Sequence, residues 1–227
     1  MIIQITSNQI DYGYLNRAEH SVVSPFFAGA NVAFRRQSLV EIGLYDEKCR
    51  SGEDQDICLR VARSGWELYF EPGARVKHRN QMSLKTHIRK WFDYGFYHPY
   101  VFQKHTTKTF TVFIPGRGAG TQSLYKRIIS FRSPVRAIVF LNPFLAMLFF
   151  TMLCLALLAF GLPYWALASA AISLVFGAAY FWPDIRKHNI WKGVVFIWLR
   201  SLANSALLAG GFLGGARTGM IYISGTL

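Results

Sequence analysis

Apolar and charged positions divide the chain near residue 136. From Ala137 to Pro183 there are 47 residues without a single Asp, Glu, Lys or Arg. A helix needs about 20 predominantly apolar residues to cross a bilayer. The pattern therefore predicts two membrane spans, over 138–160 and 164–182, joined by a tight turn at Gly161-Leu162-Pro163.

A third apolar stretch, residues 190–216, is weaker because it carries Arg200 in its interior, with Asn204 one turn further on the same face. A charged side chain in lipid is costly, so we expect Arg200 to face protein, water or a phosphate. The alternative is a shallow helix from which Arg200 reaches the membrane surface. Glycine pairs four residues apart, Gly210/Gly214 and Gly211/Gly215, favour close approach of another helix.

The part before residue 136 mixes helix and strand patterns. Apolar residues at helical spacing follow Gly52 and stop at Gly65, which predicts a short amphipathic helix. A second short helix is expected to end at Gly43. Residues 66–70 and 74–78 alternate in polarity around Pro72-Gly73, a pattern typical of two strands flanking a turn.

Residues 79–136 contain eleven Lys and Arg and one acid, Asp93. Apolar residues from Leu84 to Gly95 share one helical face, which fits a helix in the lipid headgroup region or, equally, a helix on the domain's own core. Residues 104–123 are rich in Thr and Gly and are predicted to be an exposed connection.

Composition narrows the class of protein. Of 227 residues, 52% are apolar and 16% charged, with 25 basic against 12 acidic side chains and a net charge of +13. That excludes a disordered chain. The basic residues crowd beside the predicted spans, where anionic lipids attract them, so we expect a membrane rather than a nucleic acid as partner. Three cysteines without close pairing argue against a disulfide framework or a zinc site.

The densest polar cluster is Glu53, Asp54 and Asp56. Ser51-x-x-Asp54 fits a capping box, and acids suit a helix N-terminus, so a purely structural role is one interpretation. A Gly-Ala-Asn turn and an Arg pair lie about twenty residues upstream, and His78 lies about twenty residues downstream. This ensemble favours a functional site instead.

Several ordered motifs carry a resemblance to family 2 glycosyltransferases of the GT-A fold, especially membrane-bound bacterial ones. It extends from about Phe26 to His105. The matching strings are Gly29-Ala30-Asn31-Val32-Ala33-Phe34-Arg35-Arg36, Gly43-Leu44-Tyr45-Asp46, Gly52-Glu53-Asp54-Gln55-Asp56-Ile57-Cys58-Leu59-Arg60, Gly65-Trp66, Pro72-Gly73-Ala74 and His78.

The resemblance implies roles for individual residues. Asp54, with Glu53 beside it, corresponds to the catalytic base that takes a proton from the acceptor hydroxyl. The glycine turn near the sugar corresponds to Gly29, Ala30 and Asn31. Because a departing diphosphate develops negative charge, Arg35 and Arg36 are also candidate substrate-binding residues, and Trp91 is a further candidate. His78 corresponds to the histidine that helps hold a divalent metal, Mg or Mn, against the diphosphate.

One family feature has no counterpart here: no Asp-x-Asp precedes Gly29, and 28 residues cannot build the βα units of a nucleotide-binding half. We therefore expect an α/β fragment, the C-terminal part of a GT-A domain, followed by α-helical membrane spans. The predicted parts are a partial catalytic domain (1–105), a basic juxtamembrane connection (106–136) and a transmembrane region (137–227).

The expected activity is inverting transfer of a sugar from a nucleotide-sugar to a lipid-linked or polysaccharide acceptor hydroxyl, by an intact enzyme of which this chain is the C-terminal fragment. The alternative is a non-catalytic membrane subunit that pairs with a separate nucleotide-binding chain. The resemblance to membrane-bound bacterial enzymes implies the bacterial inner membrane. Basic residues on both sides of the apolar pair predict a multi-pass protein with its catalytic part in the cytoplasm.

Overall fold

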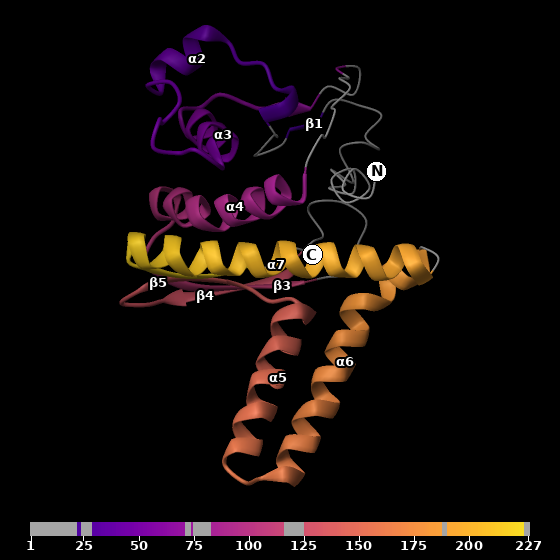
Figure 1. Ribbon diagram of the computed structural model, residues 1–227. Helices are drawn as coiled ribbons and strands as arrows, with labels where there is room; N and C mark the ends of the chain where they lie inside the picture. Colours follow the sequence, from indigo (N-terminus) through magenta and orange to yellow (C-terminus); the bar gives the residue numbers. More distant parts are fainter. Residues whose placement is uncertain are drawn as a thin grey trace.

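The computed structural model describes residues 22–23, 29–70, 74, 83–115, 125–187 and 190–224. These residues form three tiers (Figure 1). Two short helices lie at one end, two long helices and a sheet form the middle, and a helical hairpin projects at the other end. The fold is a mixture of helices and a small mixed sheet, so the α/β class is confirmed.

The upper tier carries the motifs of the predicted catalytic part. It contains η2 (Gly29–Asn31), α2 (Arg36–Glu41), α3 (Glu53–Arg63) and a two-stranded antiparallel pair, β1 (Val22–Val23) with β2 (Tyr69–Phe70). Helix α3 buries Ile57, Cys58 and Val61, and Leu68 completes this small core. The helix predicted between Gly52 and Gly65 is confirmed.

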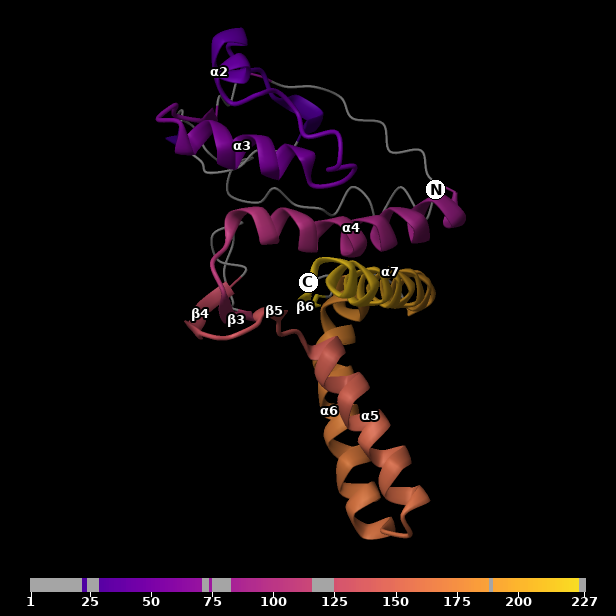
Figure 2. The same cartoon turned by 90° about the vertical axis from the view of Figure 1, so that its left-hand side faces the viewer.

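The middle tier is built on α4 (Leu84–His105) and α7 (Ile190–Thr218), which lie side by side over much of their length (Figures 1 and 2). Ser83 caps α4 by accepting a hydrogen bond from the Thr86 amide. Helix α3 packs on one side of α4, and α7 packs on the other side. Helix α4 therefore lies on the protein's own core, which is the second of the two expected placements.

The glycines of α7 permit this close pairing. A Cβ on Gly210 would lie 2.1 Å from the Phe92 carbonyl oxygen of α4, and one on Gly214 would lie 2.2 Å from that of Phe96. Gly211 and Gly215 face β6 in the same way. The expected close approach of another helix is confirmed for Gly210/Gly214, whereas Gly211/Gly215 contact a strand.

Beside α7 lies a four-stranded sheet of order β4-β3-β5-β6. Its strands are β3 (Thr109–Pro115), β4 (Tyr125–Arg132), β5 (Arg136–Phe140) and β6 (Met220–Ile223). Strand β3 pairs antiparallel with β4 and parallel with β5, and β5 pairs parallel with β6. The prediction of an exposed connection over 104–123 is thus wrong for 104–115, because Thr109–Pro115 pairs with distant parts of the chain, and residues 116–123 lie outside the described residues.

The hairpin consists of α5 (Pro143–Ala159) and α6 (Pro163–Lys187), which turn at Gly161 with a positive φ of 69°. Ser169 and Ser173 of α6 donate hydrogen bonds to carbonyl groups of α5. Within the described residues, the segment Pro163–Trp182 is long and apolar enough to cross a membrane. The 17-residue α5 is shorter, at about 25 Å for a rise of 1.5 Å per residue.

The first expected span needs correction, and the third apolar stretch, whose crossing was left open, can now be placed. The first was predicted over 138–160, but Arg136–Phe140 is a strand and the helix begins only at Pro143. The third apolar stretch forms α7, which runs across the top of the hairpin rather than alongside it (Figures 1 and 2). Several spans are not shown by this structure.

Arg200 faces protein, which is one of the three surroundings expected from the sequence. Its guanidinium lies 4.3 Å from the centre of the Tyr180 ring on α6, and the buried Asn204 donates a hydrogen bond to the Tyr180 hydroxyl. This polar contact ties α7 to the base of the hairpin.

Candidate active site

The start of α3 is held against α4 by a glycine. Gly52 is the N-cap residue, in the left-handed region with φ 79°, and a Cβ there would meet the side chains of Val101 and His98 at 3.2 and 3.3 Å. Any other residue would be both strained and crowded. Gly52 thus fixes the first turn of α3, which carries Glu53 and Asp54, directly over α4.

The Asp54 carboxylate contacts the glycine turn. Its Oδ2 accepts a hydrogen bond of 3.0 Å from the Gly29 amide, and its Oδ1 accepts one of 2.8 Å from the Gln55 amide. A Cβ on Gly29 would lie 3.4 Å from the Asp54 Cβ and 4.0 Å from a Glu53 oxygen. The fold therefore brings together the turn and the acidic pair, which the sequence separates by about 25 residues.

The capping-box interpretation is wrong for this helix. The N-cap is Gly52 rather than Ser51, and no side chain caps α3. Within the described part of the chain, the buried Ser51 hydroxyl has no hydrogen-bond partner. Asp54 therefore lies in the first helical turn with its carboxylate aimed partly at another segment.

Asn31 connects the turn to a further motif, since its side-chain amide donates a 2.7 Å hydrogen bond to the Ala74 carbonyl. Beside it is a cavity of about 360 Å³, lined by Asn31, Arg35, Trp66 and Tyr69 among others. Asp54 is not among its lining residues. The cavity lies next to the candidate reaction centre and does not contain it.

The remaining predicted site residues are scattered. Ala30 lies in η2 beside Gly29 and is exposed. Arg35 and Arg36 are exposed at the start of α2. Trp91 lies on α4 with its ring edge against His87 and Tyr94 of the same helix. His78 lies outside the described residues, and among those described no three His, Cys, Asp or Glu side chains gather as a metal site would need.

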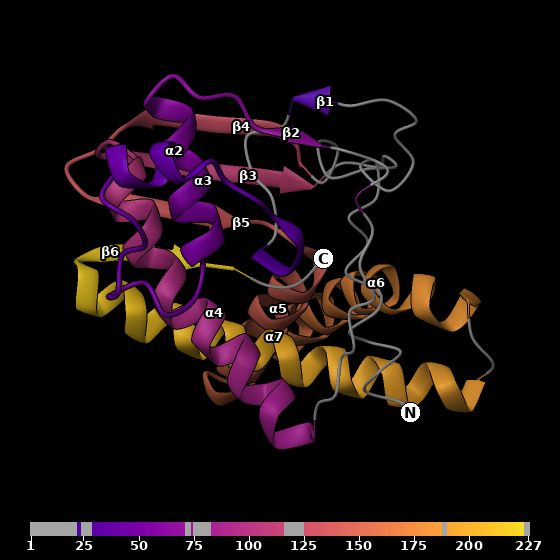
Figure 3. The same cartoon turned by 90° about the horizontal axis from the view of Figure 1, so that it is seen from above.

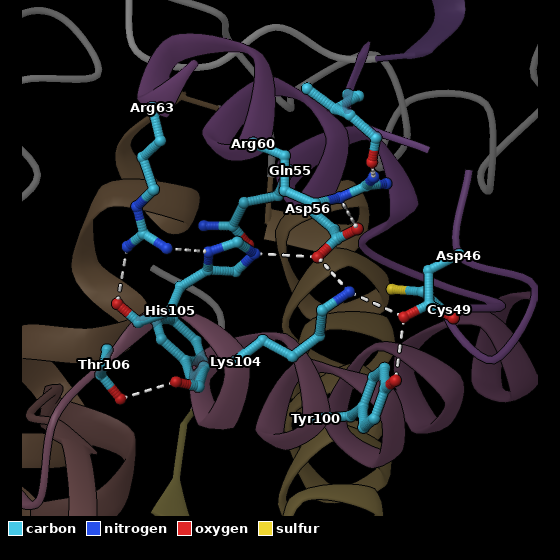
Figure 4. A network of polar contacts seen from close by, with 12 residues as sticks. Asp46, Cys49, Gln55, Asp56, Arg60, Arg63, Tyr100, Lys104, His105 and Thr106 are labelled. Atoms are coloured by element: carbon cyan, nitrogen blue, oxygen red, sulfur yellow. Dashed lines mark hydrogen bonds and ion pairs between the residues drawn. The ribbon is translucent and has the colours of Figure 1, made fainter. Parts of the chain in front are cut away.

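A polar network docks α3 on α4 (Figure 4). The fully buried Asp56 accepts hydrogen bonds from Arg60 at 2.9 Å and from Lys104 and His105 at 2.8 Å each. Lys104 also contacts Asp46 at 2.7 Å. Buried charges are tolerated only when paired in this way. Asp56, which the sequence placed in the acidic cluster, thus orients α3 and is not free for chemistry.

The electrostatics of the network are internally consistent. Burial acts to raise the pKa of Asp56, but hydrogen bonds from Lys104 and His105 outweigh it and the net pKa is lowered. The hydrogen bond from Lys104 lowers the pKa of Asp46 to about 2. Burial lowers the pKa of His105, and Arg63 donates to its Nδ1, so the ring is neutral and donates from Nε2.

Sequence reasoning missed His98. It lies on α4 directly beneath Gly52, and its Nδ1 is 3.3 Å from the Tyr222 hydroxyl of β6. Burial lowers the pKa of His98 to about 4, against a smaller opposing effect of the Asp54 charge. A neutral imidazole therefore underlies the candidate base. Only the pairing of Gly52 with α4 reveals this, because 46 residues separate His98 from Gly52.

Comparison with known proteins points to the same chemistry. Over 97 residues the chain is 33% identical to the pre-mycofactocin glycosyltransferase of Mycobacterium tuberculosis, in the CDC 1551 / Oshkosh and ATCC 25618 / H37Rv strains alike. The match covers 43% of this chain and 20% of each relative, so the aligned part is a fifth of their length. No protein-family profile and no solved structure matches the chain. The relatives support glycosyl transfer in general.

Proposed function

We propose that this chain forms the acceptor-side and membrane part of an inverting family 2 glycosyltransferase of the GT-A type. The intact enzyme moves a sugar from a nucleotide-sugar to an acceptor hydroxyl that is lipid-linked or part of a polysaccharide. The contact of Gly29 with Asp54 carries the proposal, because it joins the two motifs in which the resemblance places sugar and base. The Asn31 contact with Ala74 adds a third motif.

The proposed chemistry assigns one proton transfer to Asp54. The acceptor hydroxyl loses its proton to this carboxylate as its oxygen attacks the sugar, a contribution of about 10²–10⁴-fold. The first turn of α3 holds this carboxylate beside the Gly29 amide. Glu53 is proposed to assist Asp54 from the same helical turn. Arg35 and Arg36 are proposed to offset the negative charge on the departing diphosphate.

The divalent metal remains a proposal. Among the described residues, no three His, Cys, Asp or Glu side chains lie close enough together to hold a metal ion. A metal against the diphosphate would therefore need His78 or groups from outside the described residues. In the intact enzyme, Trp91 and Ala30 are proposed to contact the substrate.

The nucleotide-binding part is proposed to lie outside these 227 residues, either upstream in one polypeptide or in a separate chain. The lack of Asp-x-Asp before Gly29 and the match to a fifth of the relatives support this. The separate-chain version makes this protein the non-catalytic membrane subunit of a pair. Sequencing the DNA upstream of Met1 distinguishes the two, since an in-frame Asp-x-Asp segment would favour one polypeptide.

The hairpin is proposed to insert in the bacterial inner membrane as two passes, with the catalytic tier in the cytoplasm. Basic residues precede α5 and follow α6, whereas the turn at Gly161 is uncharged. The segment Pro163–Trp182 supports insertion by its length and composition.

The proposal is tested with membranes that contain the intact enzyme. Radiolabelled nucleotide-sugars are supplied with Mg²⁺ or Mn²⁺, and label is followed into lipid and polysaccharide fractions. We expect transfer that stops without a nucleotide-sugar. Membranes that transfer nothing from any common nucleotide-sugar, although the protein is present and folded, would contradict the proposal.

A further inference from the structure

Two neighbouring rows on one face of the four-stranded sheet are apolar from β4 to β6. The strand register places Phe131, Phe110, Ala137 and Ile221 in one row across all four strands. The neighbouring row, from Ile129 to Ile223, is equally apolar. Since side chains alternate along a strand, both rows lie on the same face.

This face is not the one that packs on the helices. The opposite rows contain Ile138, Phe140 and Tyr222, which form a core with Phe102 of α4. On the apolar face, Phe131 is 55% exposed and Ile221 is 47% exposed. The sheet is therefore covered by protein on one side, while large apolar side chains are exposed on the other.

Helix α7 continues the same surface with an exposed, uncharged stripe at helical spacing. The stripe consists of Trp198, Ser205, Ala209, Phe212 and Ala216. It is apolar apart from the small Ser205, and it is opposite the face formed by Leu207, Gly210 and Gly214, which packs on α4. A helix stripe that faced water would be expected to carry charged residues as well.

Sheet face and helix stripe point to the side on which the hairpin projects. Figures 1 and 2 both show α4 above α7 and the sheet edge-on above α5 and α6, and Figure 3 shows the strands face-on beneath α2 and α3. We call this surface the underside. A contiguous apolar surface of this kind marks a protein or membrane contact.

We propose that the underside lies on the lipid bilayer, with α7 in the membrane plane instead of crossing it. The proposal rests on insertion of the hairpin, because α5 and α6 leave the molecule from this same side. Continuity with the hairpin favours lipid over other occupants. Lys108, exposed immediately before β3, would meet anionic headgroups.

The proposal has a topological consequence. A helix in the interface buries its apolar stripe about 5–10 Å into the boundary of headgroups and acyl chains. Because α7 does not cross, β6 and the catalytic tier lie on the same side of the membrane.

The test places single spin labels on the chain in nanodiscs of mixed neutral and anionic lipids. Cys49 and Cys58 are buried, so they stay, and Cys154 is replaced by Ser. Labels are attached in Ile221→Cys and Phe212→Cys on the underside. The controls are Val40→Cys on α2, exposed by 57%, and Leu174→Cys in the hairpin, exposed by 74%.

Collisions with oxygen and with a water-soluble nickel complex are measured by electron paramagnetic resonance. We expect Ile221→Cys and Phe212→Cys to collide with nickel several-fold less than Val40→Cys, and Leu174→Cys least of all. Equal nickel access at Ile221, Phe212 and Val40, with Leu174 protected, would overturn the inference and leave the inserted hairpin intact. Nickel access at Leu174 would refute hairpin insertion as well, and dipolar broadening between underside labels would indicate a second copy as occupant.

Discussion

Gly210→Ala tests the pairing of α4 with α7, which lies between the upper tier and the hairpin. The new Cβ would lie 2.1 Å from the Phe92 carbonyl oxygen, whereas real Cβ contacts do not fall below 3.0 Å, so the backbones must separate by about 0.9 Å. Gly95 and Gly214 make equally close contacts along the same line, which prevents a local tilt. Such overpacking costs about 1–3 kcal/mol.

Alanine also gains about 1 kcal/mol over glycine from helix propensity. With the clash at the upper end of its range, we expect a net loss of about 2 kcal/mol. For a chain of this size that lowers Tm by about 4–8 °C. Thermal unfolding in detergent, followed by circular dichroism, measures the change.

Gly177→Ala in α6 is the matched control. Its nearest neighbour is the flexible Met147 sulfur at 3.3 Å, so we expect an unchanged or higher Tm. A Tm for Gly210→Ala at or above that of the wild type, with the control behaving as expected, would refute the close pairing of α4 and α7.

Three further predictions concern pH, the polar network and topology. The pKa of His98 is about 4 in the folded protein and 6.5 when unperturbed. Burying the neutral ring therefore costs no stability above about pH 6.5, and the free energy of unfolding falls by up to about 3 kcal/mol towards pH 4. His98→Gln should flatten this pH dependence in denaturant titrations. Asp56→Asn removes the buried charge that Arg60 and Lys104 contact, while Lys104 keeps Asp46 as a partner, so unfolding curves should show a loss of about 1.5–3 kcal/mol. Asp93→Asn, in an exposed pair with a 3.8 Å separation, should cost less than about 1 kcal/mol in the same assay. Reporter fusions at Leu162 and Lys187 should report opposite sides of the membrane, and the same side at both would refute a two-pass hairpin.

The sequence predicted the elements whose signals are local. Helix α3 could be predicted because apolar residues at helical spacing lie between two glycines, Gly52 and Gly65. In the structure both glycines adopt positive φ. The Gly-Ala-Asn turn and the acidic pair were recognised in the same way. The contact between the turn and the acidic pair could not be deduced from spacing, since it depends on the tertiary placement of η2 beside α3.

The sheet was missed because its pairing is not local. Strand β5 lies at the start of a continuous apolar run, where periodicity cannot distinguish a buried strand from a helix. Its partner β6 follows about 80 residues later, after the hairpin and α7. The same holds for His98 and Asp56, whose roles arise from contacts between α3 and α4 and not from any motif.

The most direct test of the proposed function is Asp54→Asn in the intact enzyme, with Glu53→Gln as its control. The asparagine oxygen can still accept the Gly29 hydrogen bond, so the turn keeps its position while the proton acceptor is lost. We predict that kcat for sugar transfer falls by about 10²-fold or more with unchanged nucleotide-sugar affinity, and that Glu53→Gln loses less. Transfer by a folded Asp54→Asn enzyme within about threefold of the wild type would contradict the assignment of Asp54 as the base.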